Sequence, residues 1–340
     1  MSKITGKPRE LKKVNTSLII DSVKKRVTAS RAEIVEDTKI SHTTVSAILK
    51  ELIKDNEIIS IGLDESSGGR RAERYKINSN RRCIIVISIE RNKVFFRVVN
   101  RLGEVLDANS SKLVDLNDTN TIFKIIDNLY ERYSNIKGIG VSVPGIVTEN
   151  GYLSGRGIDD WQEINIKKQI EERYSTPTIL ENDLNSKALA FYDKYKEENK
   201  NNKSSIVYLN FTKLGSGAGI IANGQLLRGD NNYAGEIGII PIGNSYLNDI
   251  LYNPLDDVDY CNTILNTIRI ITSIINPKIV VLGGDEFRYE LAEKIIDTYK
   301  AKYKIATNIL LEDIEKNYAL LGITQLALNL INEEFKLVNG

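Results

Sequence analysis

The chain has 340 residues, which is longer than one typical domain and sufficient for two or three. Hydrophobic residues make up 41%, charged residues 27% and the net charge is +1, as in an ordinary globular protein. We find no apolar stretch of about 18 residues and no signal-peptide pattern, so we expect a cytoplasmic protein with no membrane span.

The charge is distributed unevenly along the chain. Residues 1–82 contain 18 basic and 11 acidic side chains, which gives +7, and the remaining residues carry −6. A basic head on an acidic body indicates a polyanionic partner for the head.

Three short helices are expected in the basic head. Ser17 can cap the first, and Ser30 with Glu33 forms the capping-box pattern that starts the second. Ser41 opens the third, whose apolar residues recur at helical spacing, namely Val45, Ile48, Leu49 and Leu52. Two short helices joined by a tight turn are typical of a helix-turn-helix.

Small polar residues at the start of the third helix lie off its apolar stripe and are expected to face outward. Hydroxyl and imidazole groups can contact phosphates or base edges, and a helix N-terminus favours a phosphate. The candidate DNA-binding residues here are Ser41, His42, Thr43, Thr44 and Ser46. From the helices alone, an ordinary three-helix bundle remains open.

The next segment favours DNA binding. Strands expected at 57–61 and 74–77 flank a glycine-rich turn, which predicts a β-hairpin. Such a wing can lay guanidinium groups along a phosphate ridge or in a minor groove. The candidate residues at its tip are Gly69, Arg70 and Arg71.

Beyond the head, the pattern changes to α/β. Strands are expected at 83–89, 94–99 and 103–106, and the same succession recurs at 205–211, 219–222 and 224–227. Each block is followed by helices and a further buried strand, at 137–143 and at 278–282. This duplication predicts two similar lobes around a cleft, where small ligands usually bind.

Several motifs follow one another in a specific order. They are Gly138–Gly145, Glu181–Asp183, Leu227–Asp230, Ala234–Gly238 and Asn276–Gly284. Together with the head, this set resembles the regulator branch of the ROK family of repressors and sugar kinases, over about residues 10–330. The resemblance implies an N-terminal winged helix-turn-helix (α+β) followed by an α/β duplicated actin-like, ribonuclease-H-like sugar-kinase fold.

The resemblance also implies domain limits. The DNA-binding head would span residues 1–80 and the ligand-sensing body 81–340. Within the body, one lobe would comprise about 81–200 plus the C-terminal helix, and the other 201–310.

Candidate ligand-binding residues follow from the same resemblance. In the family's kinases the residue matching Asp183 is a general base on a sugar hydroxyl, and those matching Asn182 and Glu236 bind the sugar. Without the resemblance, an Asn-Asp pair after a strand is equally well a turn and helix cap. Gly157 replaces a further sugar-binding asparagine, and the adjacent Arg156 could pair with a phosphorylated sugar.

Two family features are altered. The first phosphate loop of the kinases carries an aspartate and paired glycines, where this chain has Ser88–Asn92 with the repulsive carboxylate of Glu90. We therefore expect no phosphoryl transfer, no catalytic residues and no cofactor. The second loop, Thr212–Gly219, keeps its glycines.

The family's zinc ligands are also missing. Ile239 and Ile240 stand where the zinc-binding histidine is expected, and the only histidine, His42, lies in the head. Cys83 and Cys261 match no metal spacing, so we expect free thiols and no metal site.

The favoured interpretation is a sequence-specific transcription regulator, most simply a repressor, of carbohydrate-metabolism genes such as those for xylose. Its expected partners are operator DNA, a sugar or sugar-phosphate effector, and further copies of itself in a homodimer or homotetramer. Two alternatives stay open: an active ATP-dependent sugar kinase with a DNA-binding head, and a regulator with a protein effector and a vestigial sugar site.

Overall fold

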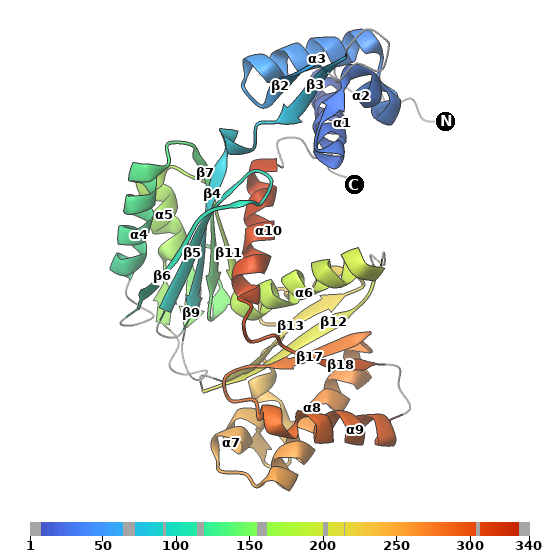
Figure 1. Ribbon diagram of the computed structural model, residues 1–340. Helices are drawn as coiled ribbons and strands as arrows, with labels where there is room; N and C mark the ends of the chain where they lie inside the picture. Colours follow the sequence, from blue (N-terminus) through green and yellow to red (C-terminus); the bar gives the residue numbers. More distant parts are fainter. Residues whose placement is uncertain are drawn as a thin grey trace.

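A computed structural model of the protein describes residues 8–63, 72–90, 93–113, 119–154, 162–199, 203–213, 215–303 and 307–332. In these ranges a small head is joined to a body of two lobes (Figure 1). None of the helices described is both long and apolar enough to cross a membrane.

The head combines three helices with a three-stranded antiparallel sheet in the order β1-β3-β2. Its elements are α1 (Pro8–Arg26), β1 (Ala29–Ser30), α2 (Arg31–Thr38), α3 (His42–Lys54), β2 (Ile58–Leu63) and β3 (Glu73–Ile77). The apolar side chains of these elements form a separate core, which includes Ile19, Ile34, Leu49 and Tyr75.

Local sequence signals identify two of the three helix starts in the head. The expected capping box is confirmed, because Ser30 Oγ accepts the Glu33 N–H and Glu33 Oε2 accepts the Ser30 N–H. Ser41 caps α3 as expected. The expected start at Ser17 was wrong: α1 begins at Pro8, where a proline without an N–H is tolerated in a first turn.

The first lobe is built on a five-stranded sheet in the order β11-β7-β4-β5-β6. The strands are β4 (Cys83–Glu90), β5 (Lys93–Asn100), β6 (Val105–Lys112), β7 (Ile136–Val143) and β11 (Thr178–Asn182). Apolar side chains of α4 (Thr119–Arg132) and α5 (Ile166–Tyr174) pack on one face. A small antiparallel sheet lies between β7 and α5 in the chain and comprises β8 (Ile146–Val147), β9 (Tyr152–Ser154) and β10 (Gln162–Ile164).

The second lobe repeats this plan in the order β14-β13-β12-β17-β18, so the expected duplication is confirmed. Its strands are β12 (Ile206–Thr212), β13 (Gly215–Ala222), β14 (Gln225–Leu226), β17 (Ile279–Gly283) and β18 (Asn308–Leu311). The helices α8 (Asp257–Ile275) and α9 (Ala292–Lys302) cover one face. The short elements β15 (Pro241–Ile242), β16 (Ser245–Tyr246) and α7 (Leu247–Tyr252) precede α8.

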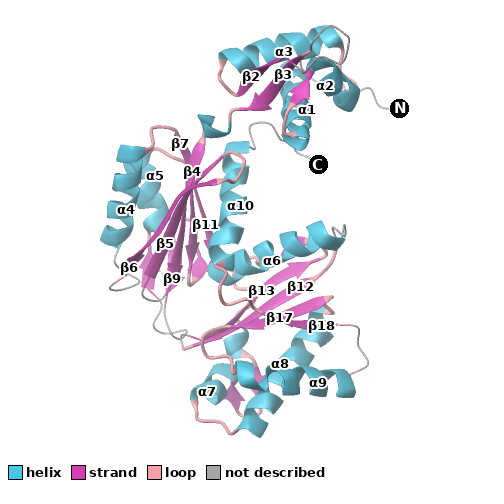
Figure 2. Ribbon diagram, in the orientation of Figure 1, coloured by secondary structure: helices cyan, strands magenta, loops and turns pink. Residues whose placement is uncertain are grey.

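Two helices meet between the lobes, as Figure 2 shows. Side chains of α10 (Tyr318–Asn332) pack on the free face of the first sheet, and side chains of α6 (Asp183–Asn199) pack on the second sheet. Apolar side chains of α6 thus share a core with strands of the second lobe.

The glycine-rich segment differs from expectation. Residues from Gly215 onward form β13, paired with β12, rather than an open loop. A Cβ at Gly217 would lie 2.4 Å from the Leu184 side chain, and one at Gly219 would lie 2.0 Å from the Leu184 carbonyl oxygen. These glycines thus allow α6 to approach the sheet closely.

Candidate ligand site and nucleic-acid interface

The N-terminal end of α3 carries small polar side chains. Ser41, His42 and Thr43 are exposed, whereas Thr44 and Ser46 are half-buried. Ser41 Oγ accepts the Thr44 N–H at 3.2 Å and lies 2.9 Å from both threonine hydroxyls. Hydroxyls and an imidazole thus surround the positive end of a helix, a combination that suits a phosphate.

The expected wing is framed by β2 and β3. Their antiparallel register runs from Ile58 opposite Ile77 to Leu63 opposite Glu73. Four expected site residues lie outside the part of the chain that the structure describes: Gly69, Arg70, Arg71 and Arg156.

Asn182 and Asp183 connect β11 to α6. Asn182 Oδ1 accepts the N–H groups of Leu184 and Asn185, at 2.9 and 3.1 Å, and its Nδ2 donates to the Gly145 carbonyl at 3.0 Å. Asn182 therefore acts as a helix cap, and it fixes Asp183 as the first residue of α6.

Asp183 belongs to a cluster of carboxyl groups. Burial raises the pKa of Asp183 from 3.8 to about 6; the Lys187 charge opposes this shift and the Glu90 charge adds to it. Burial and the charge of Asp183 raise the pKa of Glu236. Burial also raises the pKa of Glu90, which accepts a hydrogen bond from Asn317 at 2.8 Å. Asp183 thus lies within electrostatic reach of both Glu236 and Glu90.

Lys187 supplies the compensating charge one helical turn after Asp183. Its Nζ lies 3.0 Å from Glu312 Oε1 and 3.3 Å from Asn210 Oδ1. Glu312 also accepts the Gly284 N–H at 3.1 Å. The Lys187 and Glu312 side chains are 18% and 9% exposed, so the pair is largely shielded from water.

A second ion pair joins the lobes. Arg228, which follows β14, donates to Glu181 Oε2 through Nε at 2.9 Å and through Nη2 at 2.6 Å. Glu181 is the penultimate residue of β11, and its side chain is only 4% exposed. Nearby, Asn232 Nδ2 donates to the Val147 carbonyl at 3.0 Å. These bonds hold the segment after β14 against the first lobe.

Sequence reasoning missed the roles of Lys187, Glu312 and Arg228. The four-residue spacing between Asp183 and Lys187 could have indicated a shared helix face. Arg228 and Glu181 lie within quoted motifs, but their pairing depends on how the two lobes meet. No local pattern indicates Glu312.

Carboxylates and amides in this arrangement can accept and donate hydrogen bonds to the hydroxyls of a small polar ligand. The excess of carboxyl groups over cations disfavours an anion. In the described ranges, no group of three or more His, Cys, Asp and Glu side chains is arranged to hold a metal ion. Cys83 and Cys261 are buried free thiols, and burial raises the pKa of each.

Similar proteins include bacterial repressors. The xylose repressor of Bacillus spizizenii is 29% identical over 68% of this chain, and the match spans 61% of that protein's length. The xylose repressor of Caldicellulosiruptor bescii is 27% identical over 97% of this chain and 84% of its own length.

Solved structures share the fold. A ROK family transcriptional regulator, homologous to the Escherichia coli MLC protein, matches 95% of this chain and 98% of its own, with a TM-score of 0.66 and 17% identity. The ROK hexokinase of Thermus thermophilus matches 74% of this chain and 99% of its own, with a TM-score of 0.56 and 18% identity. The ROK family model matches residues 85–263, more than half of the chain, and this protein therefore belongs to the ROK family.

Proposed function

We propose that this protein is a sugar-responsive transcription repressor. Its head would be a winged helix-turn-helix, with α2 and α3 as the two helices and the β2–β3 hairpin as the wing. The residues at the start of α3 would contact DNA together with Gly69, Arg70 and Arg71. Two copies would read two half-sites as a homodimer.

The observation that carries this proposal is the surface at the start of α3. Ser41, His42 and Thr43 are exposed on a head with its own core and a positive charge. A recognition helix contacts base edges through its N-terminal residues, and phosphates supply most of the affinity. The similarity to proteins named xylose repressor supports the same function.

The effector would bind beside Asp183, with Glu236 as a further contact and Asn182 as the cap that positions Asp183. Because Asp183, Glu236 and Glu90 are acidic and Lys187 is already paired with Glu312, we propose a neutral sugar rather than a sugar phosphate. Xylose is the first candidate. Arg156 would support the phosphorylated alternative.

The test begins with selection of DNA fragments from a random pool by the full-length protein. Affinity for the selected fragment is then measured by fluorescence anisotropy at fixed salt, with xylose, other pentoses and hexoses, and their phosphates. We expect a neutral sugar to weaken DNA binding at least about fivefold, as expected for allosteric coupling of 1–3 kcal/mol.

Matched variants assign the DNA contacts. Replacing His42 and Thr43 by Ala should lower affinity for the selected sequence by about 1–3 kcal/mol per lost base contact. Replacing the exposed Lys124 and Lys168 of the body by Ala should leave it unchanged. Equal affinity for selected and scrambled DNA would contradict the proposal.

A second candidate function is sugar phosphorylation, favoured by Asp183 because a carboxyl group with a pKa near 6 can accept a hydroxyl proton. Glu90 faces the same cluster, and Glu312 already occupies the Gly284 N–H, which leaves little support for a nucleotide phosphate. ADP release with a pentose or hexose, abolished by Asp183→Asn, would establish this activity. If DNA binding is specific but no sugar alters it, the effector is a protein.

A further inference from the structure

Glu57 lies at the boundary between head and body. It follows α3, and its side chain is only 6% exposed. Arg82, at the start of the body, donates to Glu57 Oε1 through Nε at 3.0 Å and Nη2 at 2.7 Å. Arg101, in the turn between β5 and β6, donates to Glu57 Oε2 and is 3% exposed. One carboxylate of the head is thus held by two guanidinium groups of the body, an arrangement we name the Glu57 clamp.

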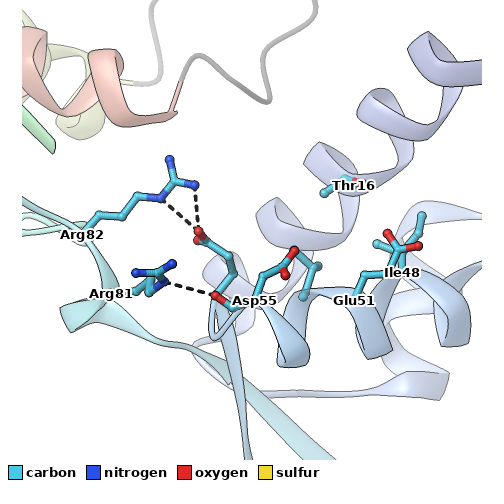
Figure 3. Close-up of a pocket in the computed structure, with 8 residues that line it drawn as sticks. Thr16, Ile48, Glu51, Asp55, Arg81 and Arg82 are labelled. Carbon is cyan, nitrogen blue, oxygen red and sulfur yellow. Dashed lines mark hydrogen bonds and ion pairs between the residues drawn. The ribbon is translucent and has the colours of Figure 1, made fainter. Parts of the chain in front are cut away.

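The surrounding contacts made by the segment that joins head and body are polar. The Asn78 N–H donates to the Glu57 carbonyl at 2.9 Å, and Arg81 Nε donates to the Asp55 carbonyl at 3.1 Å. A pocket of about 330 Å³ opens beside these contacts, and Figure 3 shows Arg81 and Arg82 pointing toward the end of α3 at its edge. The apolar core of the head contains only head residues. In the described chain, therefore, no shared apolar core fixes the angle between head and body.

Because its charges are buried, the clamp is costly to open. An exposed ion pair can open at little cost, but separating a buried carboxylate from its guanidinium partners leaves uncompensated charges away from water. Because Glu57 belongs to the head and Arg101 to the body, rotation of the head would break this pairing. The clamp therefore restricts rotation more strongly than the linker hydrogen bonds can.

Helix α10 connects the clamp with the candidate ligand site. At its first turn, Asn317 Oδ1 accepts the Leu320 N–H, while Asn317 Nδ2 bonds Glu90 in the carboxyl cluster. At its last turn, the Ile331 carbonyl accepts a bond from Arg82 Nη1 at 3.4 Å. A helix of 15 residues spans about 22 Å. A displacement of α10 at the ligand site would therefore also move the end of the helix that contacts Arg82 of the clamp.

We propose that Glu57 is a positioning residue, which fixes the orientation of the head on the body and so sets the half-site spacing that paired heads can read. This inference rests on the proposed DNA-binding function. A stiff connection between two binding modules gives strong avidity at one spacing, whereas a loose connection gives weaker avidity over many spacings.

The first measurement is a distance distribution between head and body. Nitroxide labels at Lys50→Cys and Lys124→Cys, both exposed, report across the boundary in the full-length protein, where Cys83 and Cys261 are buried. We expect one narrow distance, broadened at least about twofold by Glu57→Gln because the linker alone then sets the orientation. The matched control is Glu51→Gln, the same change at an exposed glutamate of α3 that pairs with Lys12.

The second measurement uses the selected DNA with its half-sites moved apart by one to five base pairs. The wild type should lose about tenfold in affinity when the spacing changes by half a helical turn, and Glu57→Gln should vary less than about twofold. Affinity for a single half-site should stay unchanged, which a head that had merely unfolded would not show. Arg101→Gln provides an independent test, because it opens the same clamp from the body side.

The outcomes separate the two proposals. If the protein selects no DNA sequence, the proposed function fails, while the distance measurement still tests the clamp. If DNA binding is specific but Glu57→Gln and Arg101→Gln keep both the narrow distance and the spacing preference, the role of Glu57 is wrong and the proposed function stands.

Discussion

At the scale of single residues, the junction between the lobes concentrates groups whose pKa values depart from their ordinary ranges. The pKa values of Asp183 and Glu236 are both raised, with burial as the main cause. A protein gains no stability from burying ionised carboxyl groups that repel each other. Residues that are present despite such a cost in stability are typical of binding sites.

The pH dependence of stability follows from Asp183. Because its pKa rises from 3.8 to about 6, the folded state binds more protons than the unfolded state between these values, and stability falls as pH rises through this window. Asp183→Asn should therefore raise the melting temperature at pH 7.5. The gain should shrink toward pH 5, where the wild-type carboxyl group is protonated.

Thermal unfolding from pH 5 to 8 checks this prediction, with Asp193→Asn on the same helix as the control. Asp193 pairs with Lys196 near the surface, so the control should show no gain at pH 7.5. A melting temperature of Asp183→Asn below the wild type at pH 7.5 would contradict the assigned cause of the shift.

At the scale of elements, the crossing of α6 and α10 depends on one glycine. A Cβ at Gly322 would lie 1.8 Å from the Ser186 carbonyl oxygen. Backbone atoms cannot yield as a flexible side chain does, so the two helices must separate to admit a methyl group.

We expect Gly322→Ala to destabilise the protein by about 3 kcal/mol, at the upper end for an overpacked core. Urea unfolding measures the loss. Gly138→Ala is the matched control, because its added Cβ would lie 3.3 Å from a methyl group of Ile84, a side chain that can shift. Equal destabilisation by both variants would show that the close crossing is not the cause.

The helices and strands also show which features could be predicted from the sequence. The capping box at Ser30 and the apolar stripe of α3 are local, so they were found correctly. Strand β6 was expected at 103–106 but runs from Val105 to Lys112, because this edge strand is largely exposed and lacks an alternating apolar pattern. The pairing of Arg228 with Glu181 joins residues brought together only by the packed lobes, which no local pattern contains.

At the scale of the whole molecule, the pair of Arg228 and Glu181 connects the lobes through a nearly buried carboxylate. Arg228 is itself 41% exposed, so its removal costs about 1–3 kcal/mol, the range for leaving one buried group without its partner. We expect Arg228→Gln to destabilise the protein by this order and to increase its radius of gyration as the lobes loosen.

Urea unfolding and small-angle X-ray scattering test both effects. The double variant Arg228→Gln, Glu181→Gln should recover much of the lost stability, because no unpaired charge stays buried. Its radius of gyration should remain as large as that of Arg228→Gln, since the link between the lobes is still absent. Recovery of both quantities would contradict a role for this pair in holding the lobes together.

The position of α10 also has a consequence for synthesis of the chain on the ribosome. The strands of the first lobe end at Asn182, but the helix that covers one face of their sheet begins only at Tyr318. At about 5–20 residues per second, translation needs on the order of ten seconds to supply it. During that interval the apolar face of β4 and β7 has no native cover. The head, whose core is complete by Ile77, can fold long before the body that orients it.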